Sequence, residues 1–309
     1  MDLPHRPQAH RPLFALGLRI ASAFLFATLY MLVKHVGESG VKLPEIMFWR
    51  QAVTLPILLG YLAFTGGLYR LKTRRLAIHG RRAALGMTNM VFNFGATILL
   101  PLAESTVLGF TTPLFAVVLG ALVLREHIGP YRWVAVALGY AGVLIVAQPG
   151  GEPISTLGMV LGLLCALFLV VINYQIRDLG RTEEPITTVF YFAAFGTPMA
   201  ALALPFFMTA HSPQQWLELI AIGAVGTFAQ LLMAASLRFG AVASVIVMDY
   251  TSLIWATLYG WLVWDRLPPA ATWLGAPLIV AAGLVIAWRE HRLGRQDALE
   301  AEQARNMSA

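Results

Sequence analysis

The chain alternates between long apolar runs and short polar breaks. Each run has about 20 residues, the length that an α-helix needs to cross the hydrocarbon core of a bilayer. The breaks contain glycine and proline, as at Gly66-Gly67, Gly129-Pro130 and Pro268-Pro269. The pattern predicts an all-α membrane protein with ten transmembrane helices, at residues 13–36, 44–64, 83–100, 104–124, 131–148, 155–176, 186–208, 215–237, 241–263 and 270–288.

The composition agrees with this class. Hydrophobic residues make up 58% of the chain and charged residues only 12%, which excludes an ordinary soluble domain. The single cysteine, Cys165, lies in an apolar run, so no internal disulfide can form. The sequence has neither a helical zinc motif nor a glycine-rich phosphate loop, so we expect no metal, no cofactor and no ATP hydrolysis.

Basic residues are distributed unequally between the two sides of the predicted membrane. One side carries both tails and the cluster at 70–82, whereas the other carries Lys34, Lys42 and Arg266. Because positive segments stay in the cytoplasm, both termini are predicted there, in a bacterial cytoplasmic (inner) membrane with anionic lipids as partners. This topology explains the net charge of +6 without a nucleic-acid partner. The first helix lacks a cleavage site and is expected to be retained.

The two halves of the chain resemble each other at a separation of about 140 residues. The matched positions are Thr112 with Ser252, Ala116 with Ala256, Gly120 with Gly260 and Trp133 with Trp273. Since five helices is an odd number, the second half would enter the membrane in the opposite direction, as in the inverted repeats of secondary transporters. We therefore divide the chain into a cytoplasmic tail (1–12), two five-helix repeats (13–148 and 149–288) and a second cytoplasmic tail (289–309).

An aspartate lies inside the predicted ninth helix. A charge at membrane depth costs about 3 kcal/mol or more, which favours a functional role for Asp249. Steps of three and four lead from it to Ser252 and Ala256, small residues that let helices approach closely. We predict that Asp249 faces protein with Ser252 and the adjacent Tyr250. It would carry a coupling proton or bind a cationic group of a substrate, and an interhelical structural hydrogen bond is the alternative.

Other polar side chains occur within the predicted spans. Asn89 and Asn93 share one face of the third helix, and Gln230 lies in the corresponding helix of the second half. Buried amides either join helices or present donors and acceptors to a ligand. Tyr191, early in the seventh helix, is either an interfacial aromatic residue or a ligand contact.

Arg50 follows Trp49 inside the second helix, roughly 9 Å deep at a rise of about 1.5 Å per residue. Its guanidinium either reaches back to the headgroups or, beside Trp49, binds a substrate carboxylate or phosphate. The depths of Arg50 and Asp249 differ by several ångströms, so they are expected to flank one site and not to form an ion pair. Arg19 and Lys34, near the ends of the first helix, are predicted at the membrane interfaces.

Pro113 lies inside the fourth predicted span, directly after Thr111 and Thr112. Proline removes a backbone donor and leaves a carbonyl unpaired, and threonine hydroxyls can satisfy that carbonyl. We predict a helix kink beside a cavity, with Thr112 among the residues that line it.

Four stretches carry a family resemblance. They are PEIMFWRQAV at 44–53, the segment 100–146 with LGFTTPLFAVVLGALVLREHIGP, IRDLGRTEEPITTVFYF at 176–192, and the segment 249–286 that begins DYTSLIWATLYGWLVWDRLPP. The chain resembles the EamA-type branch of the drug/metabolite transporter superfamily, and is similar to the group containing S-adenosylmethionine and riboflavin transporters. The resemblance implies two inverted five-helix repeats, alternating access and movement of small organic metabolites. Asp265 departs from the family pattern, which has a glutamate before this turn.

The combined features predict a secondary active transporter of a small organic metabolite, such as S-adenosylmethionine, riboflavin or an amino-acid-like solute. A proton or ion gradient would drive it, and the oligomeric state is open between monomer and homodimer. A flippase for lipid-linked substrates and a non-transport membrane scaffold are the competing hypotheses. An integral-membrane enzyme is disfavoured because no acid–base pair converges at one membrane face.

Overall fold

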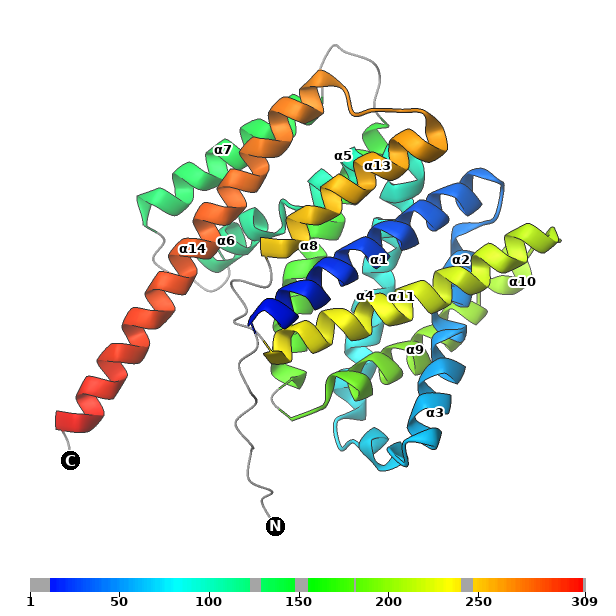
Figure 1. Ribbon diagram of the computed structural model, residues 1–309, viewed down its shortest axis with the longest axis horizontal. Helices are drawn as coiled ribbons and strands as arrows, with labels where there is room; N and C mark the ends of the chain where they lie inside the picture. Colours follow the sequence, from blue (N-terminus) through cyan, green and yellow to red (C-terminus); the bar gives the residue numbers. More distant parts are fainter. Residues whose placement is uncertain (1–11, 123–128, 148–154, 181, 240–246, 308–309) are drawn as a thin grey trace.

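Figure 1 shows a computed structural model in which helices form a bundle. The structure describes residues 12–122, 129–147, 155–180, 182–239 and 247–307. Within these ranges every regular element is a helix and none is a strand. Residues 1–11 of the predicted first tail and residues 241–246 of the predicted ninth span lie outside the described residues.

The helices of the first half are α1 (Pro12–Glu38), α2 (Leu43–Ala52), α3 (Thr54–Phe64), η1 (Leu68–Leu71), α4 (Leu76–Leu99), α5 (Leu102–Gly109), α6 (Thr112–Leu122) and α7 (Pro130–Val146). Those of the second half are α8 (Thr156–Leu179), α9 (Pro185–Ala201), α10 (Leu204–Phe207), α11 (Pro213–Phe239), η2 (Met248–Thr251), α13 (Ser252–Trp264) and α14 (Ala270–Met307).

Six helical segments are long and apolar enough to cross a membrane. They are Leu13–Glu38, Leu43–Phe64, Leu102–Leu122, Thr156–Ile176, Pro213–Leu237 and Ala270–Trp288. Pro130–Val146 is apolar but shorter. The all-helical membrane class is confirmed, and the full count of ten spans stays a prediction.

The fourth apolar run is interrupted between α5 and α6. Pro113 has no N–H with which to reach the carbonyl of Gly109, one helical turn earlier. That carbonyl instead accepts a hydrogen bond from the Thr112 hydroxyl at 2.8 Å, and the Thr111 hydroxyl donates to the carbonyl of Leu108 at 2.6 Å. The interruption therefore leaves both carbonyls paired.

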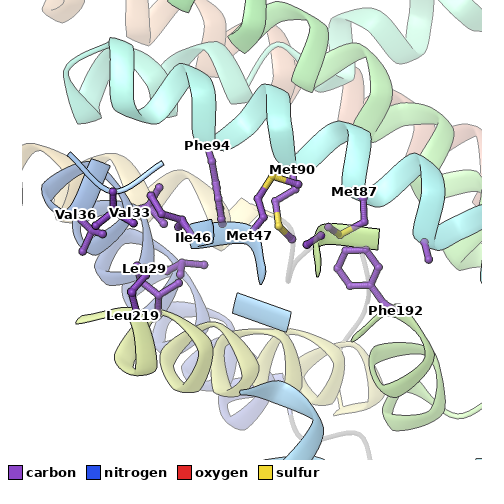
Figure 2. Close-up of a cluster of buried hydrophobic side chains, with 14 residues drawn as sticks. Leu29, Val33, Val36, Ile46, Met47, Met87, Met90, Phe94, Phe192 and Leu219 are labelled. Atoms are coloured by element: carbon purple, nitrogen blue, oxygen red, sulfur yellow. The ribbon is translucent and has the colours of Figure 1, made fainter. Parts of the chain in front are cut away.

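The main apolar core lies between α1, α2, α4, α9 and α11. Figure 2 shows Ile46, Met47, Met87 and Met90 converging in it with Phe192. α1 and α11 pack against each other at this core, and α7 lies alongside α14 at one edge of the bundle (Figure 1). This arrangement places α1 between the apolar core on one side and α13 with η2 on the other.

Glycines permit the close approach of α7 and α14. A Cβ atom on Gly142 would lie 2.7 Å from the carbonyl oxygen of Gly275, and one on Gly275 would lie 2.6 Å from that of Gly142. Real Cβ atoms do not approach carbonyl oxygens so closely. The last helices of the two halves therefore make reciprocal backbone contact, as small residues allow between membrane helices.

Candidate functional site

Asp249 forms an ion pair with Arg19. The guanidinium, on α1, donates from Nε to Oδ1 of Asp249 at 2.5 Å and from Nη2 to Oδ2. The side chain of Arg19 is 8% exposed, and that of Asp249, on η2, is 41% exposed. Two parallel charge-assisted hydrogen bonds fix both the distance and the orientation of the two groups.

Arg19, predicted near a membrane interface, is buried in protein and does not reach the headgroups. α1 packs along α11, and Ser22 on the same turn donates to the carbonyl of Ala229 at 2.8 Å. This packing turns the face that carries Arg19 inward, where Asp249 supplies a counter-charge. Lys34, also predicted at an interface, is 8% exposed and bonded to Glu38 at 2.9 Å.

A polar cluster joins α1, α4 and α8. Asn93 donates its Nδ2 to the sulfur of Cys165 at 3.3 Å, and the side chain of Asn89 also interacts with Cys165. The side chain of Tyr30 interacts with Asn93, and the charges of both Arg50 and Asp249 act on it. The structure thus brings the predicted residues Asn89 and Asn93 together, with a phenol that lies within the electrostatic range of the two charged groups.

Amide oxygens near the middle of the bundle lack partners. Oδ1 of Asn89, Oδ1 of Asn93 and Oε1 of Gln230 are buried without a hydrogen bond from any described residue. An unpaired buried acceptor costs about 1–3 kcal/mol. Native proteins tolerate such groups where water or a ligand supplies the donor. Three of the predicted residues therefore offer acceptors to a bound molecule.

Arg50 is buried in protein, with 2% of its surface exposed, which rules out the snorkelling alternative. Its Nη1 donates to the hydroxyl of Thr54 at 3.0 Å, and Thr54 is bonded to Thr227 of α11 at 2.7 Å. A Cβ atom on Gly226 would lie 2.8 Å from Nη2 of Arg50, so the guanidinium needs a glycine there. In the described part of the chain, no carboxylate forms an ion pair with Arg50.

Tyr250, Ser252 and Thr112 make local contacts. The ring of Tyr250 packs edge-on against Phe110, with centroids 4.8 Å apart, and its hydroxyl lies against Gly283 of α14. The hydroxyls of Ser252 and Thr112 donate to the backbone carbonyls three residues earlier in the chain. These three side chains contact residues outside the Asn89–Asn93 cluster.

Trp49 and Tyr191 also have other partners. The ring of Trp49 packs edge-on against Trp216, with centroids 5.1 Å apart. The hydroxyl of Tyr191 donates to the carbonyl of Leu71 at 2.7 Å, and its ring lies 4.7 Å from that of His79. Tyr191 therefore belongs to the end of the bundle where η1 meets α9.

Sequence reasoning missed Tyr30 and the pairing of Arg19. A signal was available, because residues 19, 23, 26 and 30 follow steps of four and three and so share one face of a helix. An arginine and a tyrosine on the same face of an apolar helix indicate that this face meets polar partners. The partner helices could not be inferred in the same way, because they are far away in the sequence.

Two open cavities are not lined by the side chains of this cluster. One, of about 320 Å³, is mostly apolar and is lined by residues of the α1–α2 turn, α4 and α8, including Gly37, Gly95 and Leu161. Another, of about 390 Å³, lies between α4 and α8 and is lined by Arg81, Tyr174 and Asp178 among others. Neither is lined by a predicted site residue.

Long apolar helices that enclose charged and amide side chains define a multi-pass membrane protein with a polar interior. Membrane transporters have this construction. The chain belongs to the EamA-like transporter family, which matches residues 13–148 and again residues 156–288. The family resemblance predicted from the sequence is confirmed, and with it the transport of a small molecule across a membrane in place of an enzymatic reaction.

Curated relatives are similar over nearly their whole length. The riboflavin transporter of Vibrio cholerae is 27% identical, over 93% of this chain and 97% of its own. The pseudopaline exporter of Pseudomonas aeruginosa is 29% identical, over 87% of this chain and 94% of its own. The S-adenosylmethionine uptake transporter of Rickettsia prowazekii is 26% identical, over 80% of this chain and 84% of its own. A solved crystal structure with a TM-score of 0.61 and 21% identity covers 92% of this chain and 99% of that one, which supports the fold alone.

Proposed function

We propose that this protein is a secondary active transporter that moves a small organic metabolite by alternating access. Ten transmembrane helices in two inverted repeats would form the carrier, with both termini in the cytoplasm and the protein in a bacterial inner membrane. Each predicted span overlaps a helix of the described residues, and the family matches once in each half. The reciprocal contact of Gly142 with Gly275 joins the last helices of the two halves, which also supports the repeat.

The observation that carries this proposal is the set of unpaired amide oxygens beside Tyr30. Asn89 and Asn93 hold acceptors that no described residue satisfies. A substrate with N–H or O–H groups would satisfy them, and Tyr30 would add a hydroxyl that can donate or accept. S-adenosylmethionine, riboflavin and amino-acid-like solutes all offer such donors, so the cluster suits this range of metabolites.

The Arg19–Asp249 ion pair connects α1 to η2 and can be broken during transport. Asp249 can accept a proton, or a cationic group of a substrate, only after its contacts with the Arg19 guanidinium are released. Protonation would remove the charge that holds Arg19, so the contact between α1 and η2 would weaken. This would couple a proton to the separation of one helix from each half. The protein would act as a monomer or a homodimer.

Counterflow in proteoliposomes tests the proposal. Purified protein would be reconstituted with labelled S-adenosylmethionine, riboflavin and amino acids, and saturable exchange of at least one is expected. Asn93→Ala should reduce that exchange roughly tenfold, about the effect of one lost hydrogen bond to a substrate. Thr88→Ala is the matched control because Thr88 lies on the same helix and is exposed. No exchange from folded protein, or equal effects of both substitutions, would contradict the proposal.

A further inference from the structure

One face of α4 carries a polar stripe along its length. His79, Arg82, Gly86, Asn89 and Asn93 follow steps of three and four residues, so they lie on one face. The Asn89–Asn93 end of the stripe belongs to the cluster with Tyr30 and Cys165. The other end, at Arg82, has no role in the proposed site.

Arg82 is a buried cation with unused donors. It is 8% exposed, and its Nε and Nη1 are buried without a hydrogen-bond partner. The guanidinium carbon lies 4.7 Å from the centre of the Phe192 ring, a cation–π contact that replaces only part of its hydration. In the described part of the chain, no carboxylate forms an ion pair with Arg82.

The carboxylates near this end of α4 already have partners. Asp178 pairs with Arg75 at 2.5 Å, and Glu184 lies 3.7 Å from Arg70. Glu183 accepts a hydrogen bond from Thr73 at 2.5 Å and lies 3.9 Å from His79. The local acids are thus engaged, whereas two N–H groups of Arg82 remain available.

Phe192 lies over the stripe between Arg82 and Asn89. A Cβ atom on Gly86 would be 2.6 Å from a ring carbon of Phe192, so the ring of this α9 residue rests directly on the glycine. Figure 2 shows the same ring beside Met87 at the edge of the apolar core. Movement of Phe192 away from Gly86 would connect the two ends of the stripe.

We propose that Arg82 binds the carboxylate or phosphate group of a substrate on the cytoplasmic half of its path, and that Arg50 receives the same group at the central site. The inference rests on the proposed transport function and narrows it to anionic or zwitterionic metabolites. Both arginines are buried and lack an acidic partner among the described residues, whereas Asp249 is already neutralised by Arg19. A substrate would therefore meet unpaired positive charge at both places, and guanidinium groups bind carboxylates and phosphates well.

Anion-dependent thermal stability tests the inference without knowledge of the substrate. Detergent-purified protein would be heated with increasing inorganic phosphate, with sodium chloride at equal ionic strength as the reference. Phosphate should raise the Tm of the wild type saturably. Arg82→Gln should weaken the apparent phosphate affinity roughly tenfold or more, the effect of losing a charge-assisted hydrogen bond.

Arg74→Gln is the matched control, because Arg74 is exposed in the turn before the same helix and its loss removes the same charge. It should leave the phosphate effect unchanged. Should Arg82→Gln fail to fold, Arg82→Lys keeps the charge but removes the planar fork, and is expected to weaken phosphate binding about threefold or more, whereas Arg74→Lys does not. No phosphate effect in the wild type, or equal losses in the Arg74 and Arg82 variants, would overturn the inference.

Two further measurements distinguish a lipid headgroup from a substrate anion, and failure of this inference from failure of the transport proposal. Stabilisation that needs Arg82 but appears only with phosphatidylglycerol, and not with phosphate, would assign this site to a lipid headgroup and overturn the substrate path. Counterflow without any phosphate effect would overturn this inference and leave transport intact. Phosphate binding that depends on Arg82, in protein that exchanges no metabolite, would leave the anion site and contradict the transport function.

Discussion

Arg19 and Asp249 are 230 residues apart in the sequence, yet their side chains form a bidentate ion pair. The pair links α1, in the first matched half, to η2, in the second. Its members are unequally buried, because Arg19 is 8% exposed and Asp249 41%. Removing one partner therefore has different consequences from removing the other.

Asp249→Asn should destabilise the protein more than Arg19→Met does. The first change leaves the more buried guanidinium without a counter-charge, whereas the second leaves a carboxylate that is partly exposed. Breaking a fully buried pair costs about 3–5 kcal/mol, and the exposure of Asp249 places both effects below that range. Thermal unfolding in detergent would show which of the two variants has the lower Tm.

The double variant Arg19→Met/Asp249→Asn provides the control for this prediction. It removes both charges, so its loss of stability should be smaller than the sum of the two single losses. The difference, the coupling free energy, is expected to be roughly 1–3 kcal/mol. Additive effects of the two substitutions would show that the ion pair contributes nothing to the folded state.

Gly226→Ala should disturb Arg50. The new Cβ atom would lie 2.8 Å from Nη2 and closer still to Nε, so the guanidinium must leave its contact with Thr54. Overpacking of this kind typically costs about 1–3 kcal/mol. The measurements are the Tm in detergent and counterflow of whichever metabolite the wild type exchanges, and both should decrease.

Gly60→Ala is the matched control for this substitution. Gly60 lies within α3, and a Cβ atom there would meet nothing within 4 Å. The control should leave Tm and exchange near the wild-type values, since alanine favours a helix by up to about 1 kcal/mol over glycine. If both variants behaved alike, the close contact between Gly226 and Arg50 would have no energetic importance.

The length of the apolar runs was sufficient to predict an all-helical membrane protein, because spanning a membrane requires long apolar runs whatever their neighbours are. It did not predict the breaks that divide residues 44–64 into α2 and α3 and residues 104–124 into α5 and α6. Helical spacing indicated that Asn89 and Asn93 act together, since they share a helix face. Their contacts with Tyr30 and Cys165 could not be predicted, because these bring together helices that are distant in the sequence. The small residues on its helix face indicated that Asp249 faces protein, but they did not identify Arg19 as its partner.

The placement of Arg19 shows where the sequence argument was insufficient. Distance from the end of an apolar run gives the depth of a residue along a helix, but not the direction in which its side chain points. Arg19 lies less than two turns into the first predicted helix, so an interfacial position was a reasonable expectation. The packing of α1 against α11 and η2 turns it inward instead. Arg82 was likewise predicted only as part of a cytoplasmic basic cluster.

Cysteine accessibility can test the predicted orientation. Cys165 is the only cysteine and is buried, so Cys165→Ala gives a suitable background. Single cysteines at Ser39 and Ser212, both exposed, should react with a membrane-impermeant maleimide in intact cells. Cysteines at Lys72 and Thr182 should react only after permeabilisation, because the basic segments are predicted in the cytoplasm. The reverse pattern would place both termini outside.

His79 should make the protein less stable in acid. It lies before the predicted span 83–100 and is 1% exposed. Burial lowers the pKa of His79 below its ordinary value of 6.5, Glu183 opposes this shift, and the charges of Arg82 and Arg75 add to it. Between the folded pKa and 6.5 the unfolded chain binds more protons than the folded one, so stability rises with pH across that interval.

His79→Gln removes this titration and should flatten the pH dependence. The Tm of the wild type is expected to fall relative to that of the variant as the pH decreases from about 7 to about 5, and the difference should begin near the unfolded pKa of 6.5. Above neutral pH the two proteins should keep a constant difference, because His79 is then neutral in both states. Parallel Tm curves over the whole range would contradict the prediction. A fall confined to the wild type would show that protonating His79 beside Arg82 opposes the folded state, which is the expected result if that end of α4 already holds unpaired positive charge.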